Sequence, residues 1–318
     1  MTTTAPMQTS TVPQRASVGI WIALLSAATF GSSGSFGKSL LEAGWTPGAV
    51  VTARVSGAAL VMAVPSAIAL RGRWHVLRQH VGVLSVYGIV AIAVCQVFYF
   101  NAVTRMSVAL ALLLEYLAPV LIIGILWLRS RVRPSRLTLT GAGLSVAGLV
   151  LVLNLTGEVR VDLVGVAWGL AAALCLVVYF VISARPLEGL PALVLASGGL
   201  TIAAVFLLVA GALGVMPMAA PADDVPFMGA QVSWVVPLLG MVVIATSVSY
   251  TVGIVSTRLL GSRLASFVGL TEVLFAVFFA WLMVGEMPLP IQLLGGALIV
   301  VGVACVRYDE LSVRPLPA

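Results

Sequence analysis

Apolar runs of about twenty residues recur along nearly the whole chain, and they constrain its fold more than any other feature. A hydrocarbon core about 30 Å thick is crossed by about 20 helical residues at 1.5 Å per residue. The chain is 61% hydrophobic and only 9% charged, whereas a soluble domain carries roughly 25% charged residues. The sequence therefore predicts an all-α integral membrane protein. Ten transmembrane helices are expected, at residues 18–37, 47–70, 81–103, 107–129, 137–155, 163–184, 191–213, 232–256, 262–284 and 290–306.

The basic residues of the loops divide unequally between the two sides of the membrane. All loop and tail Lys and Arg residues fall on the side of the termini except Lys38, Arg105 and Arg160, while Arg54 lies inside a span. The positive-inside rule then puts both termini in the cytoplasm. We expect a multi-pass protein of the cytoplasmic membrane, and the net charge of +6 is not interpreted as a sign of nucleic-acid binding.

The two ends of the chain are predicted to lie outside the spans. Residues 1–17 are rich in Thr, Pro and Ser, which is typical of a disordered tail. Residues 307–318 are expected to form a second cytoplasmic tail. The apolar run after residue 17 is not interpreted as a signal peptide, because its removal would destroy an internal repeat.

That repeat appears when the chain is shifted against itself so that Glu115 falls on Glu272, which aligns RMSVALALLLEYLAPVL with SRLASFVGLTEVLFAVF. We infer two repeats of five helices, residues 18–155 and 163–306. Because five is odd, the second repeat enters the membrane in the opposite orientation. Inverted repeats are typical of secondary transporters, whose substrate site lies near the bilayer midplane between the halves.

Glycines also recur in register between the fifth and tenth expected helices. Gly141 aligns with Gly295, and Gly148 aligns with Gly302. Small residues let transmembrane helices approach closely. We therefore expect these glycine faces to pack tightly.

Three ionisable residues lie deep inside the expected spans: Arg54, Glu115 and Glu272. Such residues usually pair, face a wet cavity or carry a proton. Pro119 cannot donate to the carbonyl of residue 115, so a helix break is expected there. Glu272 has Ala276 at the equivalent place, and its helix is not expected to break. Glu115 could contact substrate or a proton, or could form a structural ion pair with Arg54, and an ion pair that opens on binding could act as a gate.

Further polar residues are candidates for the wall of a cavity. Gln96 and Tyr99 share one face of the third span, and an amide in lipid needs a partner. Tyr179 in the sixth span, Ser249 in the eighth and Ser33 in the first complete the candidate substrate-binding set.

The cysteines and histidines indicate no cofactor or metal. Cys95, Cys175 and Cys305 all fall in apolar runs, where a cysteine usually acts as a small buried hydrophobe. His75 and His80 share one loop, and two ligands alone rarely make a metal site.

Several motifs carry a family resemblance over residues 18–306. The stretches TFGSSGSFGKSLL, TPGAVVTARVSGAAL, LEYLAPVL and GEMPLPIQLLGGALIVVGV resemble EamA-type carriers of the drug/metabolite transporter superfamily. Within that family, Glu115 in ALLLEYLAPV and the stretch TRLLGSRLASFVGLTEVLFA are most similar to bacterial amino-acid exporters of the threonine/homoserine type. The resemblance implies export or exchange of small metabolites through a central cavity. The Arg-rich link at residues 129–136 stands where the second repeat has the dipeptide GE. Only the opposite orientation of the two repeats in the membrane accounts for this difference.

These observations predict a secondary active transporter that exports a small organic metabolite, an amino acid or a related compound, by alternating access. A low-dielectric cavity favours the neutral form of a carboxyl group, which suits coupling to protons. A drug or quaternary-cation efflux carrier would use the same glutamates and stays open as an alternative. An intramembrane enzyme acting on lipid would need a nucleophile–base pair or a metal cluster at depth, and the expected spans contain no histidine.

Overall fold

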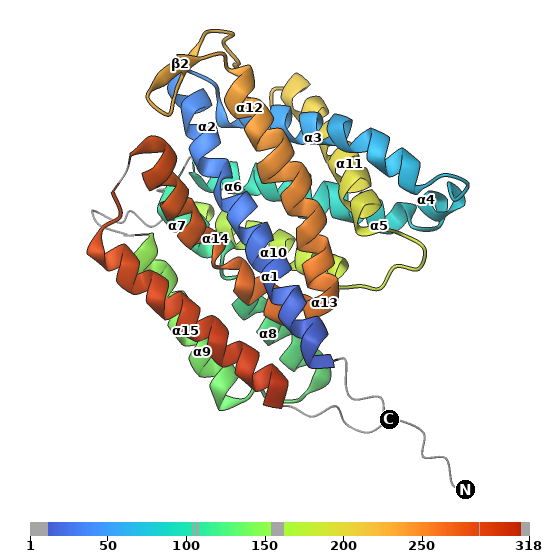
Figure 1. The fold of residues 1–318 in the computed structure, drawn as a ribbon, viewed down its shortest axis with the longest axis vertical. Coiled ribbons are helices and arrows are strands. Elements are labelled where there is room, and N and C mark those ends of the chain that lie inside the picture. Colours follow the sequence, from blue (N-terminus) through green and yellow to red (C-terminus); the bar gives the residue numbers. More distant parts are fainter. Residues whose placement is uncertain (1–11, 104, 106–107, 154–161, 286, 313–318) are drawn as a thin grey trace, which may run out of the picture.

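The computed structural model describes residues 12–103, 105, 108–153, 162–285 and 287–312. Helices from both halves of the chain pack side by side in one bundle (Figure 1). The first half contains α1 (Val12–Gly31), α2 (Ser33–Glu42), α3 (Pro47–Ala69), α4 (His75–Gln79), α5 (Val81–Val86), the π-helical η1 (Tyr87–Val94), α6 (Cys95–Val103), α7 (Val108–Glu115), α8 (Ala118–Ser130) and α9 (Arg136–Val152). The second half contains α10 (Leu163–Ser183), α11 (Ala192–Ala212), β1 (Val225–Phe227), β2 (Ala230–Val232), α12 (Val235–Val242), the π-helical η2 (Val243–Val248), α13 (Ser249–Gly269), α14 (Glu272–Phe279), the π-helical η3 (Ala280–Val284) and α15 (Pro290–Ser312).

Among the described residues, eight helical stretches are long and apolar enough to cross a bilayer. Two shorter apolar helices, Arg136–Val152 and Glu272–Val284, lie where the fifth and ninth spans are expected. The stretch Val235–Gly269 runs past the expected end of the eighth span, with a kink at Gly261, where φ is 78°. The ninth expected span is therefore divided between α13 and α14, and ten full-length spans stay a prediction.

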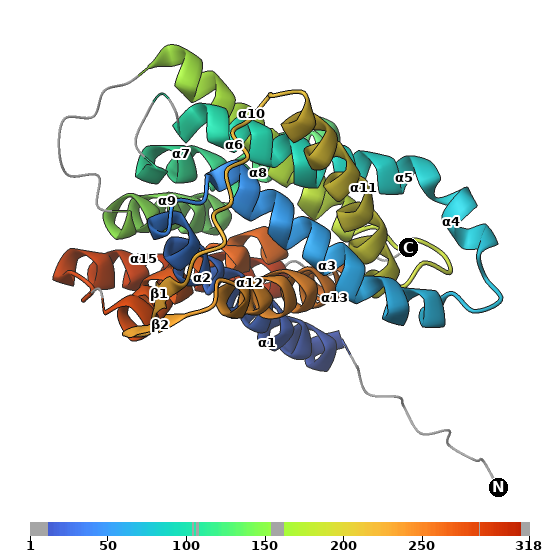
Figure 2. The same ribbon diagram turned by 90° about the horizontal axis from the view of Figure 1, so that it is seen from above.

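The helices α9 and α15 lie side by side at one edge of the bundle (Figures 1 and 2) and pack through the expected glycine faces. A Cβ atom on Gly148 would lie 2.5 Å from the carbonyl oxygen of Gly295, and one on Gly295 would lie 2.6 Å from that of Gly148. Likewise, a Cβ atom on Gly141 would collide with the carbonyl oxygen of Gly302, and one on Gly302 would collide with that of Gly141. Because repeat-equivalent glycines exchange partners across the contact, the packing has the two-fold symmetry expected of an inverted repeat.

The first and the last helix of the bundle both extend beyond their expected boundaries. The helix α1 already begins at Val12, so residues 12–17 are helical and do not belong to a disordered tail. Residues 1–11 lie outside the described part. The helix α15 continues to Ser312, past the expected end at residue 306, because Asp309 is buried and bonded.

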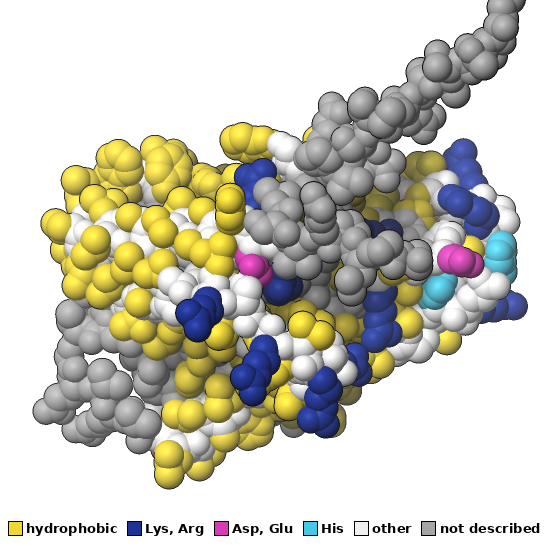
Figure 3. All heavy atoms as spheres, turned by 90° about the horizontal axis from the view of Figure 1, so that it is seen from below, with side chains coloured by type: hydrophobic (Ala, Val, Ile, Leu, Met, Phe, Trp, Pro, Cys, Tyr) yellow, Lys and Arg dark blue, Asp and Glu magenta, His cyan; other side chains and the backbone are white. Residues whose placement is uncertain are grey.

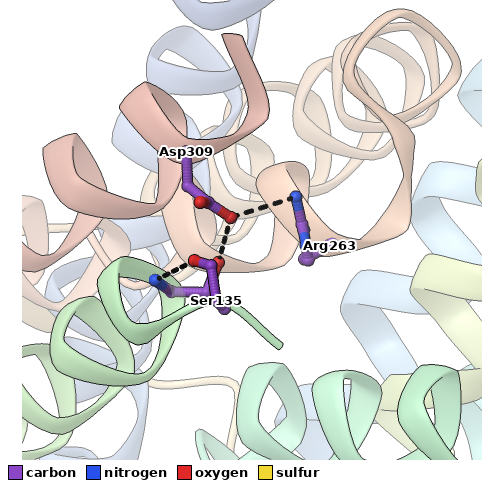
Figure 4. A network of polar contacts seen from close by, with 4 residues as sticks. Ser135, Arg263 and Asp309 are labelled. Atoms are coloured by element: carbon purple, nitrogen blue, oxygen red, sulfur yellow. Dashed lines mark hydrogen bonds and ion pairs between the residues drawn. The ribbon is translucent and has the colours of Figure 1, made fainter. Parts of the chain in front are cut away.

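A polar network fixes this end of α15 to α9 and α13 (Figure 4). The Thr138 hydroxyl donates to the Asp309 carboxylate at 2.6 Å, and Arg263 Nη2 lies 4.0 Å from the same oxygen. The Ser135 hydroxyl accepts from the backbone N–H of Thr138 at 3.0 Å and caps the first turn of α9. The network joins helices from both repeats.

A short β-hairpin departs from the expected all-α fold. The strands β1 and β2 pair antiparallel, with Val225 opposite Val232. Phe227 stacks on Phe36 of α2 at a ring-centroid distance of 5.8 Å, and Trp45 Nε1 donates to the Pro221 carbonyl at 2.8 Å. The hairpin thus packs on the end of the bundle where α2 ends (Figure 1).

The helices α1 and α15 begin and end, respectively, at the opposite end of the bundle (Figure 1). Figure 3 views the molecule from that direction, and Lys and Arg side chains spread over this face while acidic groups are few. The distribution agrees with the charge bias of the loops. The assignment of this face to the cytoplasm stays a prediction.

Candidate functional site

A cavity of about 500 Å³ lies between the two repeats. Its wall includes residues of α1, α2, α3, α6 and α7 from the first repeat and of α10, α13 and α14 from the second. It extends to Leu41 and Pro47, at the end of the bundle that carries the hairpin. Most wall residues are apolar, so the few charged groups stand in surroundings of low polarity.

Glu115 lies at a break in the fourth helix of the first repeat. The helix α7 ends at Glu115, and α8 begins at Ala118 with Pro119 in its first turn. Proline lacks the N–H that would continue the helical hydrogen bonding, which accounts for the break. The carboxylate oxygen Oε1 of Glu115 accepts from the Cys95 thiol at 3.4 Å. Glu115 and Pro119 both line the cavity.

Glu272 also lines the cavity, but the expectation that its helix continues without a break is wrong. The helix α13 ends at Gly269, and α14 begins at Glu272 itself. The Thr271 hydroxyl donates to the Val268 carbonyl at 2.6 Å, a local bond that competes with regular helix. A Cβ atom on Gly31 of α1 would lie 2.7 Å from the Glu272 carbonyl oxygen. The backbone of α1 therefore packs closely against the chain at this break.

Arg54 lines the cavity from α3. Its Nη1 donates to the Ser33 hydroxyl at 2.8 Å, and its buried Nε has no hydrogen-bond partner. Within the described part of the chain, no ion pair within 4.0 Å joins Arg54 to Glu115 or Glu272. Its charge nevertheless interacts with both carboxyls at longer range. The structure therefore has the guanidinium and the carboxyls in one cavity without a closed structural pair.

The other candidates divide into wall residues and one packing residue. Gln96, Tyr99, Tyr179 and Ser33 line the cavity. Ser249 does not, although it was expected there. Its side chain is fully buried, and its hydroxyl donates to the carbonyls of Ala245 and Thr246, at 2.7 and 3.1 Å. A serine hydroxyl in a helix can find its hydrogen-bond acceptors on its own helix in this way. A hydroxyl inside a span is therefore weak support for a substrate contact.

Two wall residues outside the predicted set bear on the chemistry of the site. Tyr250 follows Ser249 in sequence and lines the cavity. Cys95, expected to be an inert buried hydrophobe, is buried but touches the Glu115 carboxylate. No local pattern distinguishes this cysteine from Cys175, because only the packing of α6 against α7 brings its thiol to the carboxylate.

Three buried tyrosines form a continuous layer beside the cavity. The ring centroids of Tyr87 and Tyr179 are 5.8 Å apart, and those of Tyr179 and Tyr250 are 5.9 Å apart. Phe30 of α1 adds an edge-on contact to Tyr250 at 5.0 Å. Tyr179, Tyr250 and Phe30 also line the cavity. We call Tyr87, Tyr179 and Tyr250 the tyrosine layer.

The chemistry available in this cavity is recognition by charge. Two carboxyl groups can accept hydrogen bonds from an ammonium group, and a guanidinium with spare donors can bind a carboxylate. No group of three or more His, Cys, Asp or Glu side chains able to hold a metal ion occurs among the described residues. The aromatic rings offer apolar contact for the body of a ligand.

Comparisons with known proteins agree with this architecture. The family model described as the EamA-like transporter family matches residues 17–154 and again residues 163–308. No curated protein matches the chain. A solved structure described only as the crystal structure of a protein is 21% identical, covers 93% of this chain and 99% of its own, and superimposes with a TM-score of 0.74. That likeness supports the fold alone, whereas the two family matches span most of the sequence: this chain belongs to the EamA-like transporter family, within the drug/metabolite transporter superfamily.

Proposed function

We propose that this membrane transporter is a secondary active exporter of a small organic metabolite with an amino group, an amino acid or a related compound. The observation that carries the proposal is the cavity shared by both repeats, with Glu115, Glu272 and Arg54 as its charged wall residues. Its volume of about 500 Å³ falls in the range of about 300–1,000 Å³ typical of small-molecule sites. The cytoplasmic membrane is the proposed location, with both termini in the cytoplasm.

The wall suggests how a zwitterion would bind. Glu115 would accept hydrogen bonds from the ammonium group, because its only donor among the described residues is the weak Cys95 thiol. Arg54 would bind the carboxylate, since its Nη1 alone is occupied by Ser33. Tyr179 and Tyr250 would contact the apolar part of the substrate.

Alternating access would work by opening the tyrosine layer. The cavity reaches the exposed Leu41 at the hairpin end, whereas its other wall extends along α13 to Thr257 and Ser266, which are buried like the tyrosine layer. With the termini in the cytoplasm, this arrangement corresponds to an outward-facing state. Loading from the cytoplasm would require Tyr87, Tyr179 and Tyr250 to separate, which a relative movement of the two repeats could produce.

Proton coupling would place the proton on Glu115. Most of the cavity wall around the carboxyl group is apolar, and such surroundings favour its neutral form. Binding of an ammonium group would then displace the proton. In proteoliposomes that contain the purified protein and a pH-sensitive dye, substrate addition should change the internal pH, and Glu115→Gln should abolish that change.

A drug or quaternary-cation carrier is the second candidate, favoured by the excess of two carboxyls over one guanidinium in the wall. The two candidates differ in their need for Arg54. Export of an amino acid should fall at least about tenfold in Arg54→Gln, equivalent to about 1.4 kcal/mol. Resistance to a quaternary cation should be unchanged or improved by the same substitution, since the variant removes a repelling charge.

A metabolite-release screen tests the proposal directly. Cells that overproduce the wild-type chain are compared with cells that overproduce Glu115→Gln at equal membrane levels, and the medium is analysed for released amines and amino acids. A compound released only by the wild type identifies the substrate. If neither release nor cation resistance differs between the two strains, the proposal is wrong. An intramembrane enzyme is disfavoured, because the family is one of transporters.

A further inference from the structure

A second cavity, of about 380 Å³, lies between α5, α8 and α10. It shares no wall residue with the transport cavity. Apart from two arginines, its wall consists only of Gly, Val and Ile residues. We call it the α5–α8–α10 groove. A purely aliphatic wall with two cations does not suit a polar metabolite.

The two arginines complete aliphatic stripes on neighbouring helices. On α8, Ile125 is followed four residues later by Arg129, and on α10, Val177 and Val181 lead to Arg185 at the same spacing. Residues four apart lie on one face of a helix. Each row of aliphatic side chains therefore faces the groove, with an arginine side chain at its end. Arg129 is the last-turn residue of α8, and Arg185 follows the end of α10. The groove is thus apolar along its length and cationic at one end.

Neither guanidinium contacts a polar partner in the part of the chain that the structure describes. In the described residues, the side chains of Arg129 and Arg185 make no hydrogen bond or ion pair, and both residues are exposed. Arginine presents planar pairs of N–H donors that match the oxygens of a phosphate group. Two free guanidiniums beside an aliphatic groove are complementary to a molecule with a phosphate at one end and a hydrocarbon chain behind it.

We propose that the groove binds an anionic phospholipid, with its phosphate between Arg129 and Arg185 and one acyl chain along the aliphatic stripes. Hydrocarbon alone gives little selectivity, because bilayer tails are as apolar as valine. Selectivity comes from the head group, since basic pockets between transmembrane helices attract anionic lipids. The groove joins α5 and α8 of the first repeat to α10 of the second, so the bound lipid bridges the repeats.

Native mass spectrometry of the delipidated protein in neutral detergent measures this binding. Dioleoyl phosphatidylglycerol should bind the wild type at least about tenfold more tightly than dioleoyl phosphatidylcholine. The double variant Arg129→Gln with Arg185→Gln should lose that preference. Arg131→Gln with Arg133→Gln removes the same charge from exposed residues of the neighbouring loop and should keep it. Equal losses in both double variants would show diffuse surface attraction and overturn the site.

A second variant tests the acyl-chain part with both arginines intact. Gly82 lines the groove, and a Cβ atom added there would meet no atom within 4 Å. Gly82→Leu should therefore fold normally, fill the groove and weaken phosphatidylglycerol binding at least about tenfold. Unchanged binding in Gly82→Leu would exclude the acyl chain from the groove. A thermal shift produced equally well by inorganic phosphate would likewise show that no lipid tail is needed.

Discussion

Both repeats break their fourth helix, but the two breaks are displaced relative to each other in the repeat register, so that the carboxyl groups lie on opposite sides of them. Glu115 is the last residue of α7, whereas Glu272 is the first residue of α14. The N-terminus of a helix stabilises a negative charge by about 0.3–1 kcal/mol, and the C-terminus opposes it. Glu272 also interacts with the Tyr116 side chain, while Glu115 has the Cys95 thiol. Equivalent residues of the repeat therefore have different electrostatic surroundings.

The contact between α9 and α15 shows the contrary case, since there the repeats stay symmetrical. Gly148 meets Gly295 and Gly141 meets Gly302 in reciprocal contacts. A scaffold contact depends on shape alone and can be the same in both halves. The proposed zwitterionic substrate has two different ends, so we expect the two carboxyls to have different tasks. We infer that the two repeats have kept the same helix packing but have diverged in the electrostatic surroundings of their equivalent glutamates.

The largest expected effect concerns the symmetrical contact. Gly148→Leu and Gly302→Leu should each lower the amount of folded protein severely, because the new side chain would meet helix backbone. Overpacking typically costs about 1–3 kcal/mol, and a backbone obstacle cannot rotate away. Fluorescence-detected size-exclusion chromatography after mild heating measures the folded fraction. Gly143→Leu on the same helix is the control, since a Cβ atom there meets nothing within 4 Å. Normal stability of both variants would show that α9 and α15 do not pack as described.

The next effect tests the carboxyl group at the end of α7. Glu115→Gln keeps the size and hydrogen-bonding capacity of the side chain and removes only its charge. Export should fall at least about tenfold, equivalent to about 1.4 kcal/mol, while the protein level in the membrane holds. Asp223→Asn removes an exposed acid that does not line the cavity and should leave export unchanged. If Glu115→Gln loses folded protein and Arg54→Gln restores it, Glu115 is half of a structural pair instead.

Much of this arrangement is predictable from the residues, because apolar runs, repeat register and Pro119 are local signals. The break at Glu272 is not, since it depends on Thr271 bonding to Val268 and on Gly31 of a distant helix. The role of Cys95 depends on which helix packs against α6 in three dimensions. Ser249 shows the opposite error, because a polar residue in a span can satisfy itself on its own helix.

Glu272→Gln should have a smaller effect than Glu115→Gln. The carboxylate at the start of α14 acts mainly as a fixed charge of the wall, and its loss should reduce export about threefold, equivalent to about 0.7 kcal/mol. Initial export rates of both single variants and of the double variant measure the coupling between the two carboxyls. A loss in Glu272→Gln as large as that in Glu115→Gln would remove the proposed division of tasks.

The smallest effects separate a wall hydroxyl from a packing hydroxyl, one in each repeat. The Ser33 hydroxyl lines the cavity and accepts from Arg54 Nη1 at 2.8 Å, whereas the Ser249 hydroxyl donates to carbonyls of its own helical segment. Ser33→Ala should leave Arg54 less well positioned and reduce export about twofold, about 0.4 kcal/mol, through a weaker apparent affinity. Ser249→Ala should leave export within experimental error. Substrate titrations at matched membrane levels measure both. If Ser249→Ala lowered the apparent affinity and Ser33→Ala left it unchanged, the substrate would reach α13 by a route other than the cavity beside Arg54.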